Sequence, residues 1–477
     1  MKYILLALFF FINAGSTFFV LFRKNKELLP AKIQLTCINS IITVVTALIY
    51  SLVTYENSFC PEFVQVLGIL STISIVVMII GVFFKEASIV QIIPEDIKEK
   101  NNASIFFKIF GLAIASRLII YFVGYIYGIQ TFDIKTGFLE SFDSMWNKWD
   151  SIHYLNLAQN GYSTDGENAK LIVFYPFYPL LIRIAAVMFK NYLVSGVVVS
   201  NLCLGVGCYY LYKLVKIDFD EETAFRSVKY MLIYPFSFFF GIAYTESTFV
   251  ALSIMALYYM RKNKWFLAGI CGFLAALTKN QGIILVIPAA MEYVISNQVF
   301  DELRKKNLKN ILKSFFAKGI YILMIPLGTL VYFMINEILF GNWNEFLVYQ
   351  NKYFGNSFGN VFKNIKRITQ SAISPEDTFR LTYWIPFILS FLLVIFLIFY
   401  SIGRLRISYS AYMLVFLLIS FSPSFLLSGA RYILSLAPIY ISLSVLARRK
   451  EVDVILTYSS TLLLGFYTLA FLMGRVL

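Results

Sequence analysis

The sequence has little charge, one histidine and few cysteines. Of its 477 residues, 14% are charged and 59% are hydrophobic, whereas soluble domains carry about a quarter charged residues. This composition excludes a water-soluble fold. The single histidine excludes a metal cluster built on histidines. The five cysteines include no CxxC pair, so they indicate neither a disulfide framework nor a zinc site.

Motifs that bind nucleotides are also missing. The sequence has no Walker loop, and no glycine-rich fingerprint follows a strand pattern. These absences argue against ATP as an energy source and against a soluble Rossmann domain for nucleotide sugars. An enzyme of this composition that acts on sugars therefore needs a lipid-linked donor.

Long apolar runs are abundant. The mean hydropathy is +0.73, and about fifteen segments approach the ~20 residues that cross a hydrocarbon core. Such runs satisfy their backbone hydrogen bonds as helices. Segment 174–190 has two prolines near its start and contains Arg183, so we expect it to be interfacial or only partly inserted. The predicted fold is all-α and polytopic, with about 14 transmembrane helices.

Basic residues cluster in short segments between the apolar runs, as in 23–26, 261–264 and 448–450. The positive-inside rule places such segments on the cytoplasmic side. The connections 130–170 and 341–380 are then predicted on the external side. The net charge of +14 therefore indicates membrane topology, and nucleic-acid binding is not predicted.

Three regions are predicted along the chain: a three-helix membrane extension over 1–100, a main membrane domain over 101–447 and a C-terminal span over 448–477. The longest polar segment is the large external loop 130–170. Its centre, Met145 to Leu157, has the apolar spacing of a short amphipathic helix that lies on the membrane.

The densest group of chemically active side chains lies in this loop. Trp149, Asp150, His153 and Tyr154 are close in sequence, and on a helix Asp150 and His153 are neighbours. The group offers a carboxylate base, a partner able to orient it and aromatic faces suited to a sugar. The alternative is an interfacial anchor, because Trp and Tyr gather at membrane surfaces and Asp can cap a helix.

Short turns between apolar runs carry further candidates: Tyr244 with Glu246, Lys279 with Gln281, and Arg431 with Tyr432. An unpaired carboxylate inside the membrane costs on the order of 2.5–3.5 kcal/mol, so Glu246 is either functional or, if its turn reaches water, only a loop acid. Lys279 and Arg431 can each hold a phosphate. The alternative is that both side chains snorkel to the interface.

Three spaced patterns of residues carry a family resemblance. The first, W-D-x-x-H-[FY]-x-x-[IL]-A-x-x-G-Y, is matched by Trp149, Asp150, His153, Tyr154, Leu157, Ala158, Gly161 and Tyr162. The second, F-F-P-x-[FY]-P, is matched by Phe174, Pro176, Tyr178 and Pro179, with Tyr175 in place of a phenylalanine. The third, P-x-x-x-F-x-x-x-x-Y-[ST]-E-x-x-F, is matched by Pro235, Phe239, Tyr244, Thr245, Glu246 and Phe249.

Together these patterns resemble the GPI second-mannosyltransferase family and its bacterial relatives, within the GT-C class of glycosyltransferases that use polyprenol-phosphate sugars. The resemblance covers roughly residues 105–445. It is looser at Arg431 and at Lys279, where the family usually has arginine. Lysine keeps the positive charge there but loses the bidentate fork.

The resemblance implies a GT-C-like fold and an inverting transfer of mannose from polyprenol-phosphate-mannose to a hydroxyl of a glycan or glycolipid on the external face. In this scheme Asp150 is the base and His153 orients it. Lys279 and Arg431 would steady the donor phosphate, and Glu246 would hold sugar hydroxyls or help close the site. The remaining candidate substrate-binding residues are Trp149, Tyr154, Tyr162, Tyr244, Gln281 and Tyr432.

The partners predicted are this lipid-linked donor, a glycan or glycolipid acceptor and membrane lipid. Asp150 and other loop acids can bind a divalent ion, but no DxD motif is present, so no metal or other cofactor is predicted. Two other functions stay open: a lipid-glycan flippase or transporter, and a glycan ligase or polymerase with a lipid diphosphate donor. The short, lysine-rich loops favour a bacterial plasma membrane, with the endoplasmic reticulum as the alternative.

Overall fold

The structure is a computed structural model that describes residues 76, 79–84, 86–87, 103–132, 137–357, 359–374, 376–424 and 429–476. The predicted three-helix extension over 1–100 lies almost wholly outside these described residues. Throughout the described part the secondary structure is helical, without a strand, and a single isolated bridge joins Ile402 to Leu405. The prediction of an all-α fold is confirmed.

Helices long and apolar enough to cross a membrane support the prediction of a polytopic membrane protein. In the described residues these are α4 (Ala103–Phe132), α8 (Tyr192–Lys216), η5 with α15 (Gly319–Leu323 and Met324–Phe340), η6 with α18 (Arg380–Trp384 and Ile385–Ser401), and α22 (Lys450–Leu472). That gives five spans, or six with one bent pair. The count of about 14 stays a prediction.

The bent pair is the segment that the prolines mark. Helix η2 (Glu167–Val173) and helix α7 (Phe177–Phe189) meet at 113°. Pro176 lies in the break, where its ring removes a backbone donor and restricts the preceding residue. The expectation that 174–190 is interfacial or only partly inserted stays a prediction.

Shorter helices fill the rest of the bundle. They are α9 (Glu221–Ile233), η3 (Ser237–Phe240), α10 (Glu246–Arg261), α11 (Trp265–Thr278), η4 (Asn280–Leu285), α12 (Val286–Ser296), α13 (Val299–Arg304), α14 (Leu308–Ala317), α19 (Ile407–Ser420), α20 (Gly429–Leu434) and α21 (Pro438–Leu446). The apolar run over 229–244 is not one helix, because α9 ends at Ile233, before Pro235. Buried Arg117 of α4 holds this break, since its guanidinium donates to the carbonyls of Leu232 and Ser237.

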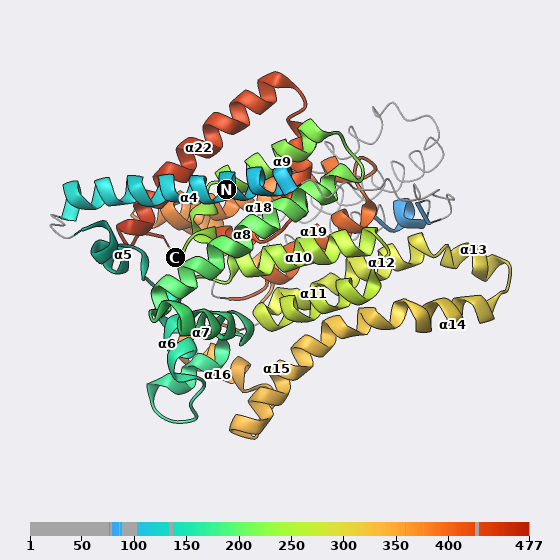
Figure 1. Cartoon of the computed structure of the whole chain (residues 1–477), viewed down its shortest axis with the longest axis horizontal. Coiled ribbons are helices and arrows are strands. Elements are labelled where there is room, and N and C mark those ends of the chain that lie inside the picture. The colour runs from blue at the N-terminus through green and yellow to red at the C-terminus, as the bar shows by residue number, and fades with distance from the viewer. Residues whose placement is uncertain are drawn as a thin grey trace, which may run out of the picture.

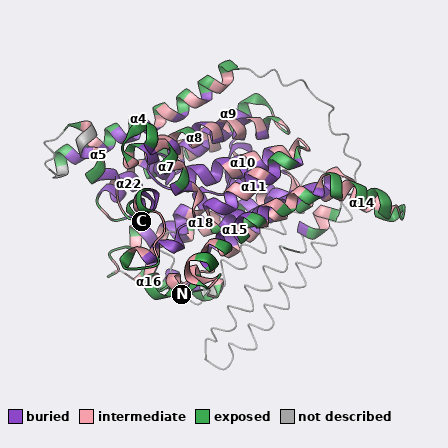
Figure 2. Cartoon of the chain, turned by 60° about the horizontal axis from the view of Figure 1, so that its bottom comes forward, coloured by how far each residue is buried: buried purple, intermediate pink, exposed green. Residues whose placement is uncertain are grey.

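The core is a set of closely packed helices in which small residues let backbones approach. Helices α8, α10 and α11 lie side by side at the centre (Figure 1), and their buried faces form the core in Figure 2. A Cβ placed on Gly207 of α8 would lie 3.2 Å from the Cα of Ala251 on α10. A Cβ on Gly328 of α15 would lie 2.3 Å from the carbonyl oxygen of Phe273 on α11. Such contacts are typical of helices packed in membranes.

The two long connections fold into helices that meet. The first contains α5 (Phe138–Trp146) and α6 (Asp150–Asn160), so the single helix predicted over 145–157 is wrong: it breaks at Trp149, which has φ 54°. The second contains α16 (Glu345–Phe354) and α17 (Val361–Ile373). Helix α16 packs against η2. The region that carries most of the sequence motifs is thereby covered by the second connection.

A labelling experiment checks the arrangement of these ends across the membrane. Lys148, two residues before Asp150, contacts Leu472 at the last turn of α22, whereas Lys450 begins that helix. A helix of 23 residues is about 33 Å long, enough to cross a ~30 Å core. Cysteines at positions 150 and 450 are therefore expected to react with an impermeant maleimide from opposite sides. Reaction from the same side would contradict this topology.

Candidate active site

Asp150 is presented by a strained turn. The backbone N–H of Ser151 donates to the carbonyl of Lys148 at 3.2 Å, and between them Trp149 adopts φ 54° and ψ −122°. This conformation suits glycine and is rare for a bulky residue. The hydroxyl of Tyr244 donates to the same Lys148 carbonyl at 2.9 Å. The turn fixes Asp150 as the first residue of α6.

Four charged side chains meet next to this turn. Nη2 of Arg431 lies 2.6 Å from Oδ2 of Asp150, and Nε of Arg431 lies 3.2 Å from Oε1 of Glu246. Nζ of Lys279 donates to the same Glu246 oxygen at 2.9 Å. Glu246 is fully buried, whereas the Asp150 side chain is 29% exposed. The cluster holds two cations and two anions, so each buried charge has a partner.

The local structure explains why these charges are held here. Glu246 begins α10, where the positive end of the helix dipole favours a carboxylate. The guanidinium of Arg431 lies 5.2 Å from the ring centre of Tyr244 and 5.4 Å from that of Phe239. Such aromatic faces stabilise a cation that has left water. The third sequence pattern, which contains Phe239, Tyr244 and Glu246, therefore forms one wall around Arg431.

A cavity of about 420 Å³ opens above the cluster. Its charged lining residues are Asp150, Lys279 and Arg431, and its other described lining residues are uncharged. Aromatic side chains line it at Tyr154, Phe174, Tyr175, Phe346, Phe354 and Tyr432, and amides at Asn280, Gln281, Gln350, Asn351 and Asn356. The cavity therefore combines a cationic patch with surfaces that suit a neutral sugar.

Three buried oxygens at this site have no hydrogen-bond partner among the described residues. They are Oε1 of Gln281, Oγ of Ser420 and Oε2 of Glu246. Gln281 and Ser420 line the cavity, and Glu246 lies against Arg431. Buried polar atoms are nearly always paired, so these oxygens mark positions where a polar ligand can bind.

The structure brings most of the predicted site residues together. Asp150, Tyr154, Lys279, Gln281, Arg431 and Tyr432 line the cavity, and Glu246 and Tyr244 pack directly against Arg431. The other three predicted residues, like Tyr244 and Glu246, are not among the lining residues. Trp149 is 40% exposed beside α22, Tyr162 donates to the carbonyl of Phe174 at 2.6 Å, and His153 packs its ring on Phe174.

His153 does not hold Asp150 in this structure. The ring centres of His153 and Phe174 are 5.1 Å apart, and within the described residues no hydrogen bond joins His153 to Asp150, whose carboxylate pairs with Arg431. Burial lowers the pKa of His153 below its usual 6.5, against the opposing effect of the Asp150 charge. Burial therefore favours the neutral form of the ring. The orienting role of His153 stays a prediction.

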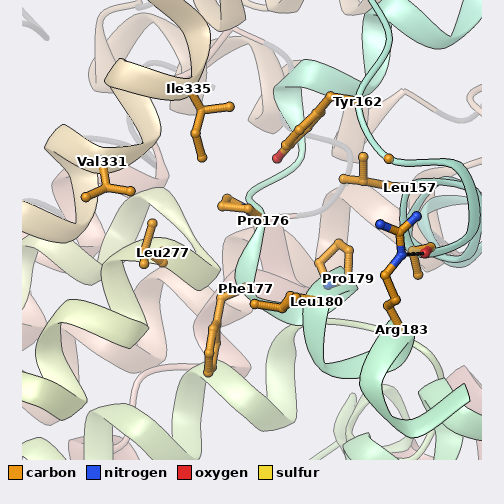
Figure 3. Close-up of a pocket in the computed structure, with 12 residues that line it drawn as sticks. Leu157, Tyr162, Pro176, Phe177, Pro179, Leu180, Arg183, Leu277, Val331 and Ile335 are labelled. Atoms are coloured by element: carbon orange, nitrogen blue, oxygen red, sulfur yellow. Dashed lines mark hydrogen bonds between the residues drawn. The ribbon is translucent and has the colours of Figure 1, made fainter. Parts of the chain in front are cut away.

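Figure 3 shows a second, apolar pocket of about 330 Å³. Val331 and Ile335 of α15 form one side, and Leu157 of α6 and Leu180 of α7 lie on the other. Two chain segments contribute to both spaces. Tyr175 and Thr278 line the cavity, and their sequence neighbours Pro176 and Leu277 line the pocket. The cavity suits a polar group of a ligand, and the pocket suits an apolar one.

Several lining residues were missed by the sequence patterns. Phe346, Gln350, Asn351 and Phe354 come from α16, and Ser420 ends α19. A signal for α16 was present, because loop 341–380 was predicted on the same side as loop 130–170 and is rich in amides and aromatics. Nothing in the sequence around Ser420 marks it.

No group of three or more His, Cys, Asp or Glu side chains placed to hold a metal ion occurs among the described residues. Asp150 and Glu246 have cations as their immediate neighbours. Whether the protein uses a metal is not tested by this arrangement, and metal independence stays a prediction.

Comparisons with known proteins point to membrane mannosyltransferases. Residues 175–339 match the family model described as dolichyl-phosphate-mannose-protein mannosyltransferase. The chain is 30% identical over 147 residues to GPI mannosyltransferase 2 of Schizosaccharomyces pombe, which is 30% of this chain and 31% of that protein. It is 28% identical over 168 residues to GPI mannosyltransferase 2 of Cryptococcus neoformans, or 32% and 38% of the two chains. No solved structure matches.

These matches confirm the resemblance to the GPI second-mannosyltransferase family, and with the apolar helices they support a multi-pass membrane glycosyltransferase. The chain spans about a third of the length of these curated relatives, so its own activity and substrates are proposals. Both relatives come from eukaryotes, and they give no support to the preference for a bacterial plasma membrane.

The strain at Trp149 predicts an unusual order of stabilities. Glycine adopts φ 54° freely, whereas alanine does not, and strain of this kind costs about 1–3 kcal/mol. Trp149→Gly is therefore expected to be more stable than Trp149→Ala by about 1 kcal/mol, although glycine is normally the weaker residue. Thermal unfolding of both variants in one detergent measures the difference. A more stable alanine variant would show that the turn is relaxed.

Proposed function

We propose that the protein is an integral-membrane mannosyltransferase that moves mannose, with inversion, from polyprenol-phosphate-mannose to a hydroxyl of a glycan or glycolipid. The observation that carries the proposal is one cavity with the accessible carboxylate of Asp150 and the cations of Lys279 and Arg431. Such a transfer needs a base for the acceptor and positive charge beside a phosphate leaving group. The names of the family model and the relatives support mannose as the sugar.

In the proposed reaction, Asp150 accepts the proton of the acceptor hydroxyl while that oxygen attacks the anomeric carbon of mannose. The bond from this carbon to the phosphate oxygen breaks, and its electron pair leaves with the polyprenyl phosphate. The products are the mannosylated acceptor and polyprenyl phosphate, and the protonated Asp150 then loses its proton to water. No general acid is needed, because the lipid phosphate leaves as an anion.

Arg431 changes partners in this scheme. Without a donor, its Nη2 occupies an oxygen of Asp150 at 2.6 Å. A donor phosphate beside Arg431 and Lys279 competes for the same N–H groups, and a guanidinium has five donors to distribute. Phosphate binding therefore frees an oxygen of Asp150 for the acceptor. Lys279, which already donates to Glu246 at 2.9 Å, supplies the second positive charge, so the scheme needs no metal ion.

The apolar pocket in Figure 3 supports a donor linked to a lipid. Its lining includes Leu277, two residues before Lys279 in the chain. In a polyprenol-phosphate sugar the hydrocarbon chain is esterified to the phosphate, so a chain in this pocket follows directly from a phosphate at Lys279. The pocket is lined almost wholly by apolar side chains, which is what a hydrocarbon chain requires.

Charge at the two ends of the bundle supports a reaction on the external face. Helix α10 runs from Glu246 at the site to Arg261 in a basic segment, and α22 runs from the basic segment at Lys450 to the site. Both helices thus have their basic end away from the cavity. By the positive-inside rule that basic end is cytoplasmic. The cavity then faces the external or lumenal side.

Transfer by the purified protein tests the proposed function. We expect labelled mannose to pass from synthetic polyprenol-phosphate-mannose to an acceptor in a pool of glycans and glycolipids. Asp150→Asn is expected to lower the rate about 100- to 10,000-fold, because a neutral amide cannot act as base, without loss of donor binding. The control is Asp165→Asn, the same change at an exposed acid of the same connection. Full activity of Asp150→Asn would contradict the assignment.

The length of the donor chain tests the role of the apolar pocket. Ile335→Trp fills the pocket from α15 and is expected to slow transfer from a long polyprenyl donor about tenfold, because overfilling costs about 1–3 kcal/mol. Transfer from a short citronellyl donor is expected to be unchanged. Leu327→Trp places the same bulk on an exposed part of α15 away from the lining and serves as the control. Equal loss with both donors would contradict the role.

A further inference from the structure

The last turn of α22 lies against the loop that carries Asp150, although these segments are far apart in sequence. In Figure 1 this end of α22 approaches α5. Nζ of Lys148 donates to the carbonyl of Leu472 at 2.5 Å. The rings of Trp146 and Phe471 stack with centres 6.1 Å apart. The residues matched by the mannosyltransferase family model end at 339, so α22 lies outside that match.

At the C-terminal end of α22, one backbone carbonyl accepts a hydrogen bond from a lysine. Three of its last carbonyls accept hydrogen bonds from backbone N–H groups that follow the helix. Leu469 accepts from Met473, Ala470 from Arg475 and Phe471 from Gly474. Gly474 has φ 70°, the left-handed conformation in which a chain commonly turns back to pair with the last carbonyls of a helix. The carbonyl of Leu472 takes its hydrogen bond from Lys148. The negative end of the helix dipole adds to the attraction of the ammonium group.

Phe471 connects this turn to the aromatic rings of Phe239 and Tyr244, which pack around Arg431. Its ring centre lies 5.5 Å from that of Phe239 and 6.5 Å from that of Tyr244. The Tyr244 hydroxyl donates to the backbone carbonyl of Lys148. Lys148 is therefore held at two points, by Tyr244 through its carbonyl and by α22 through its ammonium group. The strained residue Trp149 follows directly.

We propose that α22 is a positioning element of the active site, and that Lys148 is the positioning residue through which it sets the place of Asp150. The proposal rests on the proposed function in taking Asp150 as the base. A turn with a bulky residue at φ 54° persists only where its surroundings hold it. Without the bond from Lys148 to α22, the turn can relax and move Asp150 away from the acceptor hydroxyl.

A matched pair of lysine variants separates positioning from general stabilisation. Lys148→Met removes the bond to α22 at the end near the site. Lys229→Met removes a comparable bond at the other end of α22, where Nζ of Lys229 donates to Asp453 at 2.6 Å and to Thr457 at 3.0 Å. Lys148→Arg keeps a cation that can reach the carbonyl. Thermal unfolding in detergent reports the loss of stability in each variant.

The test measures kcat and the KM for polyprenol-phosphate-mannose in all three variants. We expect Lys148→Met to lower kcat about 10- to 100-fold, since small misplacement of a reacting group has effects of this size, with little change in KM. Lys148→Arg should recover most of kcat. Lys229→Met should keep the wild-type kcat even if its unfolding temperature falls as far as that of Lys148→Met.

Two results would overturn the proposal. One is a kcat for Lys148→Met equal to that of Lys229→Met at matched stability, which would leave Lys148 a purely structural cap. The other is a large rise in KM with kcat retained, which would place Lys148 in donor binding. Failure of the proposed function has a different signature, because Asp150→Asn would then be active in the wild-type background.

Discussion

The largely buried guanidinium of Arg431 lies between two carboxylates, and the arrangement of the site depends on this contact. A buried arginine needs anionic partners, and those partners, Asp150 and Glu246, come from different segments of the chain. Lys279 balances the second carboxylate. The four charges therefore tie together the first long connection, the start of α10, the end of α11 and α20.

The charges of the cluster balance one another, and each is also a group that the proposed reaction needs. Two cations and two anions make the cluster neutral, so it is stable without a ligand. Its cations can bind a phosphate ester, and the carboxylate of Asp150 can accept the proton of a hydroxyl. The charges are fixed by α10 and by the aromatic rings of Phe239 and Tyr244. In the proposed reaction, little reorganisation would be required for a donor phosphate to replace a carboxylate beside Arg431.

The parts of this site that follow from local chemistry could be predicted from the sequence. The bend at Pro176 is a local effect of proline. Lys279 and Arg431 were predicted in short turns between apolar runs, on the same side as the loop that carries Asp150. The pairing of Asp150 with Arg431 and not His153 could not be predicted, because it depends on distances between remote segments. The break at Trp149 was hidden, since a positive φ is normally signalled by glycine. The sequence predicted the side on which α16 lies, but its contact with the cavity depends on tertiary packing.

The close contacts of Gly207 and Gly328 have a consequence for how this protein can vary. Where a Cβ would meet the backbone of a neighbouring helix, any larger side chain separates the helices and shifts the ends that carry Glu246 and Lys279. The lipid-facing residues of α15, such as Leu327 and Met334, are exposed and meet no such limit. Sequence drift should therefore be concentrated on the outer surface, and the inner helices should keep their small residues even where the loops diverge.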